Sequence, residues 1–239
     1  MSDGIRFFSP GPLSVIAFII LIGLLILIIP LFILGIIGAA FTRLGFSWIS
    51  AFAIVLLIIF GSFVSIPVYR IRRDIIRLSR DDAPFRGTGM LPPAPREVWE
   101  TCISLNLGGA VIPVCVSIYM IYRAILITGT SLLFSVFVGI FMVAAITFVS
   151  TRLITGVGFH VPLLLPGLTA LLAGLILTGG TGLAAAVTAF VSGTIGTLSG
   201  GNLANLFRVK MLEIPDVSIG GAGTFGTVFI CCILPALIA

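Results

Sequence analysis

The charged residues of this chain are confined to a few short stretches, and this distribution limits the folds that it can adopt. Of the 239 residues, 13 are basic and 8 are acidic. Long uncharged apolar intervals separate them, and these cover residues 7–42, 44–69, 101–122, 124–151, 153–207 and 217–239. A helix needs roughly 20 apolar residues to cross a bilayer core about 30 Å thick. The pattern therefore predicts a chain that crosses a membrane several times.

Composition points to the same class of protein. With 59% hydrophobic and 9% charged residues, the chain lacks the polar surface of a soluble globule. The intervals are longer than the strands of a membrane barrel, which span about 10 residues, so helices are the expected spanning element. The first apolar run, 13–41, is longer than the core of a cleaved signal peptide and is expected to be retained. We predict an all-α, polytopic protein that resides in the cell membrane as a multi-pass chain.

The apolar intervals define about seven transmembrane helices. Interval 153–207 is too long for one helix and breaks at Gly179-Gly180-Thr181-Gly182. The predicted spans are 12–41, 46–69, 102–122, 131–151, 161–178, 183–204 and 220–238. They form an N-terminal hairpin of two spans (1–69), a basic cytoplasmic loop (70–101) and a five-span glycine-rich membrane core (102–239).

The basic residues predict the orientation of these spans. Arginine and lysine are retained on the cytoplasmic side of short loops. With the N-terminus in the cytoplasm, all basic residues except Arg43 and Arg123 face that side. The basic balance is thus explained by topology, and no nucleic-acid partner is expected.

The loop 70–101 is the largest polar segment. Its first part, Arg70 to Arg80, places isoleucines at roughly helical spacing among arginines, which predicts a short amphipathic helix at the headgroups. Anionic lipid headgroups are the expected partner of this loop, and a docking site for a cytoplasmic protein is the alternative.

Residues suited to catalysis or metal binding are few. Cys102, Cys115, Cys231 and Cys232 form no Cys-x-x-Cys pair, and the single histidine, His160, has no acidic or cysteine residue at ligand spacing. No metal site, cofactor or catalytic residue is predicted. His160 is expected at the cytoplasmic mouth of the fifth span, either as an interfacial side chain or as a gate that senses pH.

Small residues are concentrated in two segments, 192–206 and 218–230. Gly196 and Gly200 have the small-x-x-x-small spacing that allows helices in lipid to approach closely, so we expect spans six and seven to pack together. A further cluster interrupts span three near its start and contains Asn106, Gly108, Gly109 and Pro113.

The few strong hydrogen-bonding groups near the membrane are expected on one side of it, the cytoplasmic side. These candidates for a pocket or for helix packing are Asn106, Asn202, Asn205 and the glycines Gly220, Gly221, Gly223 and Gly226. Two interpretations stay open. The asparagines either cross-link helices or form a polar pocket that handles an ion, a lipid headgroup or a peptide.

Four ordered motifs resemble an uncharacterised family of polytopic membrane proteins found in archaea and bacteria. They are GSFVSIP at 61–67, NLGGAVIP at 106–113, SGTIGTLSGGNLANL at 192–206 and SIGGAGTF at 218–225. The family pattern implies acidic residues where this chain has Asn202 and Gly226, an arrangement similar to intramembrane aspartyl proteases, and Pro235-Ala236-Leu237 resembles a presenilin-like motif. Asparagine and glycine cannot do the acid–base chemistry of peptide hydrolysis, so no active protease is expected.

Two functional hypotheses follow. The first is a transport- or channel-like protein with a polar pocket near the cytoplasmic side. The alternative is a non-catalytic structural or binding subunit, or a degenerate relative of intramembrane aspartyl proteases without the aspartates. Such a subunit would pack against a membrane-protein partner or another copy of itself through its small-residue faces.

Overall fold

A computed structural model describes residues 12–76, 96–154, 158–209, 214, 216–234 and 238. Most of them are helical, and η denotes a π-helix. The elements are α1 (Pro12–Arg43), α2 (Trp48–Gly61), β1 (Ser65–Ile76), β2 (Arg96–Asn106), η2 (Leu107–Val111), α3 (Ile112–Thr128), α4 (Leu132–Ser150), β3 (Arg152–Ile154), β4 (Gly158–His160), α5 (Leu165–Thr178), α6 (Leu183–Gly196), η3 (Thr197–Leu203), α7 (Leu206–Val209), β5 (Asp216–Ile219) and α8 (Ala222–Ile233).

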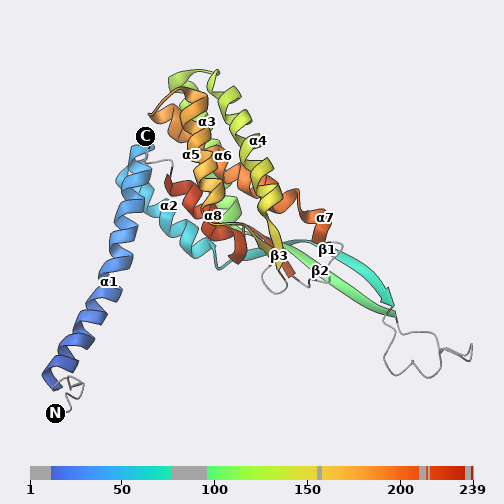
Figure 1. The fold of residues 1–239 in the computed structure, drawn as a ribbon, viewed down its shortest axis with the longest axis horizontal. Coiled ribbons are helices and arrows are strands. Elements are labelled where there is room, and N and C mark those ends of the chain that lie inside the picture. Colours follow the sequence, from blue (N-terminus) through green and yellow to red (C-terminus); the bar gives the residue numbers. More distant parts are fainter. Residues whose placement is uncertain are drawn as a thin grey trace, which may run out of the picture.

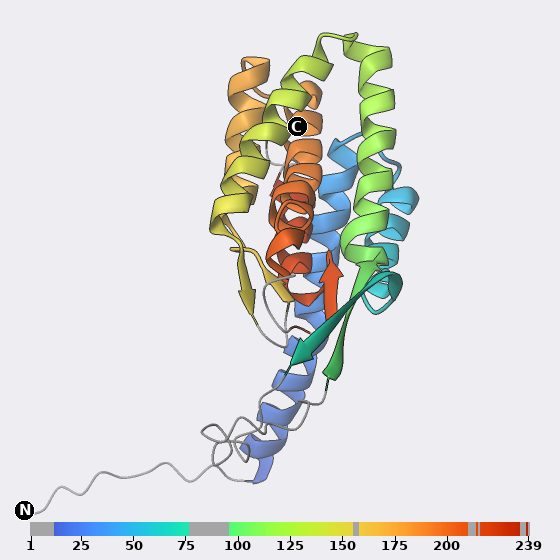
Figure 2. The same cartoon turned by 90° about the vertical axis from the view of Figure 1, so that its right-hand side faces the viewer.

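Helix α6 is the centre of a helical bundle. From Ala185 to Gly196, every residue except Ile195 is buried. Helices α3, α4, α5 and α8 all contact it, and Figure 2 shows α6 (orange) between α4 and α5 on one side and α3 on the other. The small residues of α6 let these neighbours approach closely, which explains why a helix so rich in Gly, Ala, Ser and Thr lies in the core.

Three helical segments are long and apolar enough to cross a membrane, counted over the described residues. They are Leu107–Thr128, Leu132–Ser150 and Leu183–Val209. The outer face of α4 carries Phe134, Phe137 and Phe141, each at least 70% exposed. Aromatic side chains exposed in such a row suit contact with lipid better than contact with water. The fold is therefore compatible with a membrane protein.

Helix α1 contacts the bundle near its C-terminal end. Its large side chains at Ile16, between Phe18 and Ile28, and at Leu31 and Phe32 are exposed. Phe41, in contrast, is fully buried and packs edge-on against Phe190 at a ring distance of 6.0 Å. Figure 1 shows the rest of α1 (blue) extending away from the other helices. The helix is thus fixed to α6 by one aromatic contact region.

A three-stranded sheet at one end of the bundle corrects the expectation of an all-α fold. Strand β1 pairs antiparallel with β2, and β2 pairs parallel with β5. Segment 70–76, expected to be an amphipathic helix, is part of β1, and the Arg72 guanidinium lies 2.7 Å from the Glu100 carboxylate across the strand pair. The physical reason is the alternation Tyr69-Arg70-Ile71-Arg72, because a period of two places like side chains on one face of a strand. The remainder of the predicted helix, 77–80, lies outside the described residues.

The sheet also shortens two of the predicted spans. Helix α2 ends at Gly61, before the expected end at residue 69, and the third span begins at Leu107, after the expected start at residue 102.

The β3–β4 hairpin lies at the same end of the bundle as the sheet, as Figure 2 shows, while the α3–α4 and α5–α6 connections lie at the opposite end. We call these two ends the sheet end and the loop end.

Substitution Gly200→Ala should destabilise the bundle. A Cβ at Gly200 would overlap the Ala144 carbonyl oxygen and the Thr147 hydroxyl of α4. Overpacking of this kind costs roughly 1–3 kcal/mol, so we expect the melting temperature in detergent to fall by roughly 5–10 °C.

The matched control is Gly23→Ala in α1, where nothing lies within 4 Å of the added Cβ. Its melting temperature should stay unchanged or rise slightly, since alanine favours a helix. Equal losses in the two variants would contradict the close packing of α4 on the α6–η3 segment.

Candidate functional site

Three helix ends meet inside the molecule at the sheet end. They are the N-terminus of η2 (106–109), the C-terminal end of η3 (202–205) and the N-terminus of α8 (220–224). We call this region the helix-end junction. Backbone atoms of Gly109 and Gly220 lie against each other, and Asn202 is hydrogen-bonded to Thr224. The junction therefore brings together residues from three distant parts of the chain.

Glycines allow the backbones of the helix ends in the junction to come into direct contact. A Cβ on Gly109 would overlap the Gly220 carbonyl oxygen, and one on Gly108 would overlap the Ile58 carbonyl oxygen of α2. Gly220 also has a φ of +72°, a left-handed conformation that favours glycine. Side chains at these positions would push α2, η2 and α8 apart.

Asn106 caps η2 and uses its whole amide group to do so. Its Oδ1 accepts a hydrogen bond from the Gly109 N–H at 2.8 Å, and its Nδ2 donates to the Ser62 carbonyl at 2.7 Å and the Ser65 hydroxyl at 3.2 Å. The side chain is buried. Asn106 therefore cross-links α2, β1 and η2.

Pro113 follows in the first turn of α3, where a missing N–H does no harm, and its carbonyl accepts a hydrogen bond from the Ser117 hydroxyl.

Asn202 and Asn205 are only half satisfied. The Asn202 Nδ2 donates to the Thr224 hydroxyl at 3.2 Å, and the Asn205 Nδ2 donates to the Gly200 and Gly201 carbonyls at 2.9 and 3.2 Å. Both side chains are 0% exposed, yet neither Oδ1 accepts a hydrogen bond from any described residue. A buried acceptor without a donor costs about 1–3 kcal/mol, so two such oxygens in one turn need an explanation.

The two asparagines lie where the central helix changes geometry. Segment η3 has π-helical hydrogen bonding, in which the Ala204 N–H donates to the Ser199 carbonyl at 2.8 Å. A turn follows before α7 begins at Leu206. Single π-helical turns within α-helices occur frequently at functional sites, because they redirect side chains and free backbone groups.

Threonines of α8 connect the junction to the segment before α5. The Thr227 hydroxyl donates to the Val161 carbonyl at 3.1 Å, and the Val161 N–H donates to the Gly223 carbonyl at 3.0 Å. His160 lies on the exposed face of β4, opposite Arg152 in the β3–β4 register, whereas its neighbour Phe159 is buried. The histidine is therefore the neighbour of Val161, which is hydrogen-bonded to α8, while its own side chain faces outward.

The glycines of α6 and η3 pack against two different helices, α4 and α8. Gly196 and Gly200 approach Val143 and Ala144 of α4 rather than α8, the helix expected to pack against them. The glycine of α6 that approaches α8 is Gly193, where a Cβ would lie 2.8 Å from the Cys231 Cβ. The spacing of small residues predicted a close approach, but spacing alone does not identify the partner helix.

Gly221 and Gly226 lie closest to side chains rather than to the backbone of another helix. A Cβ on Gly221 would lie 2.5 Å from the Ser218 Cβ, and one on Gly226 would lie 3.0 Å from the Leu163 Cδ1, the flexible end of a side chain. Our sequence interpretation overlooked Thr224 and Thr227, although the run GGAGTFGT places them three residues apart on one helix face.

Among the described residues, no three histidine, cysteine or acidic side chains come together in a group that could hold a metal ion. The junction consists instead of side-chain amides, hydroxyls and backbone carbonyls. These groups can bind by hydrogen bonding or by donating oxygen lone pairs, without acid–base chemistry.

The fold and the junction define a mainly helical protein with apolar segments that could cross a membrane and an uncharged polar site at one end of its bundle. Residues 59–238 match the family model described as a protein of unknown function, DUF1614, and the chain belongs to this family. The match begins near the end of α2, so it contains the whole junction and leaves α1 outside. No curated protein and no solved structure matched the chain.

Substitution Asn106→Ala should weaken the fold measurably. It removes an N-cap and two further hydrogen bonds, so a loss of about 1–2 kcal/mol is expected in detergent unfolding. Ser65→Ala, which removes the longer 3.2 Å contact with Asn106 and an exposed 3.4 Å contact between the Ser65 and Ser218 hydroxyls, should cost less. Similar losses in both variants would show that Asn106 does not hold the junction together.

Proposed function

We propose that this protein is a transport-type membrane protein and that the helix-end junction handles a monovalent cation near the cytoplasmic side. One observation carries the proposal: the Oδ1 atoms of Asn202 and Asn205 are fully buried and accept no hydrogen bond from the described residues. Both belong to a break in the central helix, and interrupted helices supply the ion sites of many transporters.

The chemistry of the junction favours an ion of single charge. An amide oxygen only accepts, so its partner is an N–H, an O–H or a cation. Divalent cations are bound chiefly by carboxylates, and no described junction residue carries one, whereas neutral carbonyl oxygens suffice for K⁺ and Na⁺.

Transport requires the junction to open, because both asparagine side chains are 0% exposed. Its glycines suit such a movement. Gly220 in the left-handed region precedes α8, and the turn after η3 separates α6 from α7. A change in backbone angles at these points would move α8 relative to α6 and admit an ion.

The proposed topology has seven crossings with the N-terminus in the cytoplasm of a prokaryotic cell. Two observations support it: each of the seven predicted intervals contains a helix, and the connections fall alternately at the loop end and the sheet end. The positive-inside rule then places the sheet end, with Arg70, Arg72, Arg152 and Arg208, in the cytoplasm.

Cysteine labelling tests this topology. In a background without the native cysteines, Ser131→Cys at the loop end should react with a membrane-impermeant maleimide added to intact cells. Tyr69→Cys in exposed β1 should react only after permeabilisation. The reverse pattern would contradict the orientation.

Ion flux tests the function. Vesicles that contain the purified protein should take up Na⁺ or K⁺, and Asn202→Leu and Asn205→Leu should each lower the rate at least tenfold. The matched control is Thr188→Val, because the Thr188 hydroxyl is also buried and has no partner in the described part of the chain, but it lies in the middle of α6, away from the junction. This isosteric change should leave flux unaltered. Absence of flux of either ion through the native protein would overturn the proposal.

A second candidate function rests on α1. The exposed apolar side chains from Ile16 to Phe32 lie outside the family match and extend away from the bundle. We infer from this that a non-catalytic subunit role is the alternative, in which α1 packs against a helix of another membrane protein or a second copy. Headgroup binding by the 70–101 loop would accompany either role. Cross-linking from cysteines introduced along α1 would test it, and a uniformly monomeric protein in the membrane would count against it.

A further inference from the structure

Arg123 is a positive charge placed inside an apolar helix. It lies five residues before Thr128, the last residue of α3. At a rise of 1.5 Å per residue this is roughly 7.5 Å below the helix end. The segment Leu107–Thr128 that holds it is one of those apolar enough to cross a membrane. A charge at such a position is costly unless it has a partner, which makes it a candidate for a function.

The protein supplies Arg123 with neutral partners. Its Nη1 donates to the Gly45 carbonyl at 2.5 Å, and its guanidinium carbon lies 6.0 Å from the centre of the Tyr119 ring. The one ion pair found within the described ranges is that of Arg72 with Glu100 at the sheet end. In the described part of the chain, the charge of Arg123 is therefore not neutralised.

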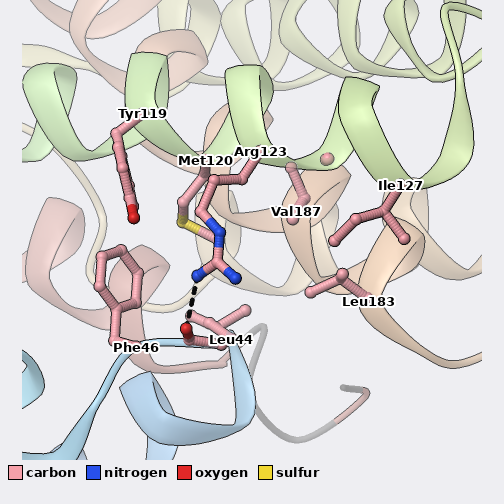
Figure 3. Close-up of a pocket in the computed structure, with 10 residues that line it drawn as sticks. Leu44, Phe46, Tyr119, Met120, Arg123, Ile127, Leu183 and Val187 are labelled. Atoms are coloured by element: carbon pink, nitrogen blue, oxygen red, sulfur yellow. Dashed lines mark hydrogen bonds between the residues drawn. The ribbon is translucent and has the colours of Figure 1, made fainter.

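A small pocket of about 20 Å³ adjoins the guanidinium, with room for about one water molecule. Its inner wall is apolar and buried and includes Leu44, Met120 and Val187. Tyr119 and Ile127, 46% and 62% exposed, stand at its rim. Figure 3 shows Arg123 reaching from α3 toward the turn that carries Leu44 and Phe46, with Val187 and Leu183 beyond.

We propose that Arg123 and the exposed rim of this pocket form a binding site for an anionic phospholipid. The lipid phosphate pairs with the Arg123 guanidinium, whose fork of N–H donors fits two phosphate oxygens. The first part of one acyl chain lies across the exposed rim residues Tyr119 and Ile127. The depth of Arg123 suits this arrangement, since it places the guanidinium near the phosphates of the adjacent leaflet.

The α1–α2 turn is shaped to leave room for the guanidinium. Gly45 has a φ of +89°, and a Cβ there would lie 3.2 Å from the Arg123 Nη1. Phe46 in the same turn packs on Tyr119 at a ring distance of 5.5 Å. A lipid held here contacts both the turn and α3, so it would stabilise the packing of α1 and α2 against the bundle.

Native mass spectrometry of the detergent-solubilised full chain tests the site. We expect phosphatidylglycerol to bind at least tenfold more tightly than phosphatidylcholine, whose ammonium group offsets the phosphate charge. Arg123→Gln should raise the dissociation constant of the first phosphatidylglycerol at least tenfold. Arg208→Gln, which alters a cation stacked on Phe148 at the sheet end, should leave it within twofold of the native value.

A second variant keeps the test decisive if Arg123→Gln fails to fold. Ile127→Ser makes the exposed rim polar without touching the bond from Arg123 to Gly45, and it should weaken phosphatidylglycerol binding at least threefold. Equal binding of both lipids, or unchanged binding in both pocket variants, would overturn the proposal. Full competition by millimolar inorganic phosphate would also overturn it, because the apolar rim would then contribute nothing.

Discussion

Backbone contact between glycines is the interaction on which this structure depends. At the sheet end the chain of Gly109 lies on that of Gly220, and along α6 and η3 the glycines Gly196 and Gly200 let α4 approach to backbone distance. In a bilayer the lipid tails are as apolar as the side chains, so burying a side chain between helices contributes little hydrophobic free energy. Close van der Waals contact between the helices then holds them together. The positions of the buried polar groups follow from these contacts.

The same close packing explains why the buried asparagines differ from one another. Asn106 is held at the start of η2 with both ends of its amide satisfied, and it serves as a structural link. Asn202 lies at the end of the π-helical segment and Asn205 just after it. Their amide nitrogens find partners, and their oxygens find none among the described residues. The fully hydrogen-bonded Asn106 is therefore a structural residue. Asn202 and Asn205, whose oxygens lack partners among the described residues, are the candidate ligands. The proposed lipid site at Arg123 lies at the other end of the bundle and depends on a different feature, an uncompensated charge beside an apolar pocket.

Much of the helical architecture could be predicted from the charge map, since each uncharged interval contains at least one helix. The sheet could not be predicted by counting apolar residues. Strand pairing of 65–76 with 96–106 depends on the alternation around Tyr69 and Ile71, which our helical interpretation overlooked. The helix that packs on Gly196 and Gly200, α4, could not be predicted either. The spacing of small residues shows that a helix can be approached closely, but it does not identify the neighbouring helix. The unpartnered oxygens depend on the π-helical turn, for which the sequence offers no local rule.

The most direct test of the central claim is an anomalous diffraction measurement on crystals of the protein soaked in thallium(I), a heavy substitute for K⁺. The account predicts an anomalous peak in direct contact with the Oδ1 atoms of Asn202 and Asn205. The peak should be lost in Asn205→Leu and kept in Thr188→Val. A well-ordered junction without an anomalous peak would contradict the claim that these oxygens serve a cation.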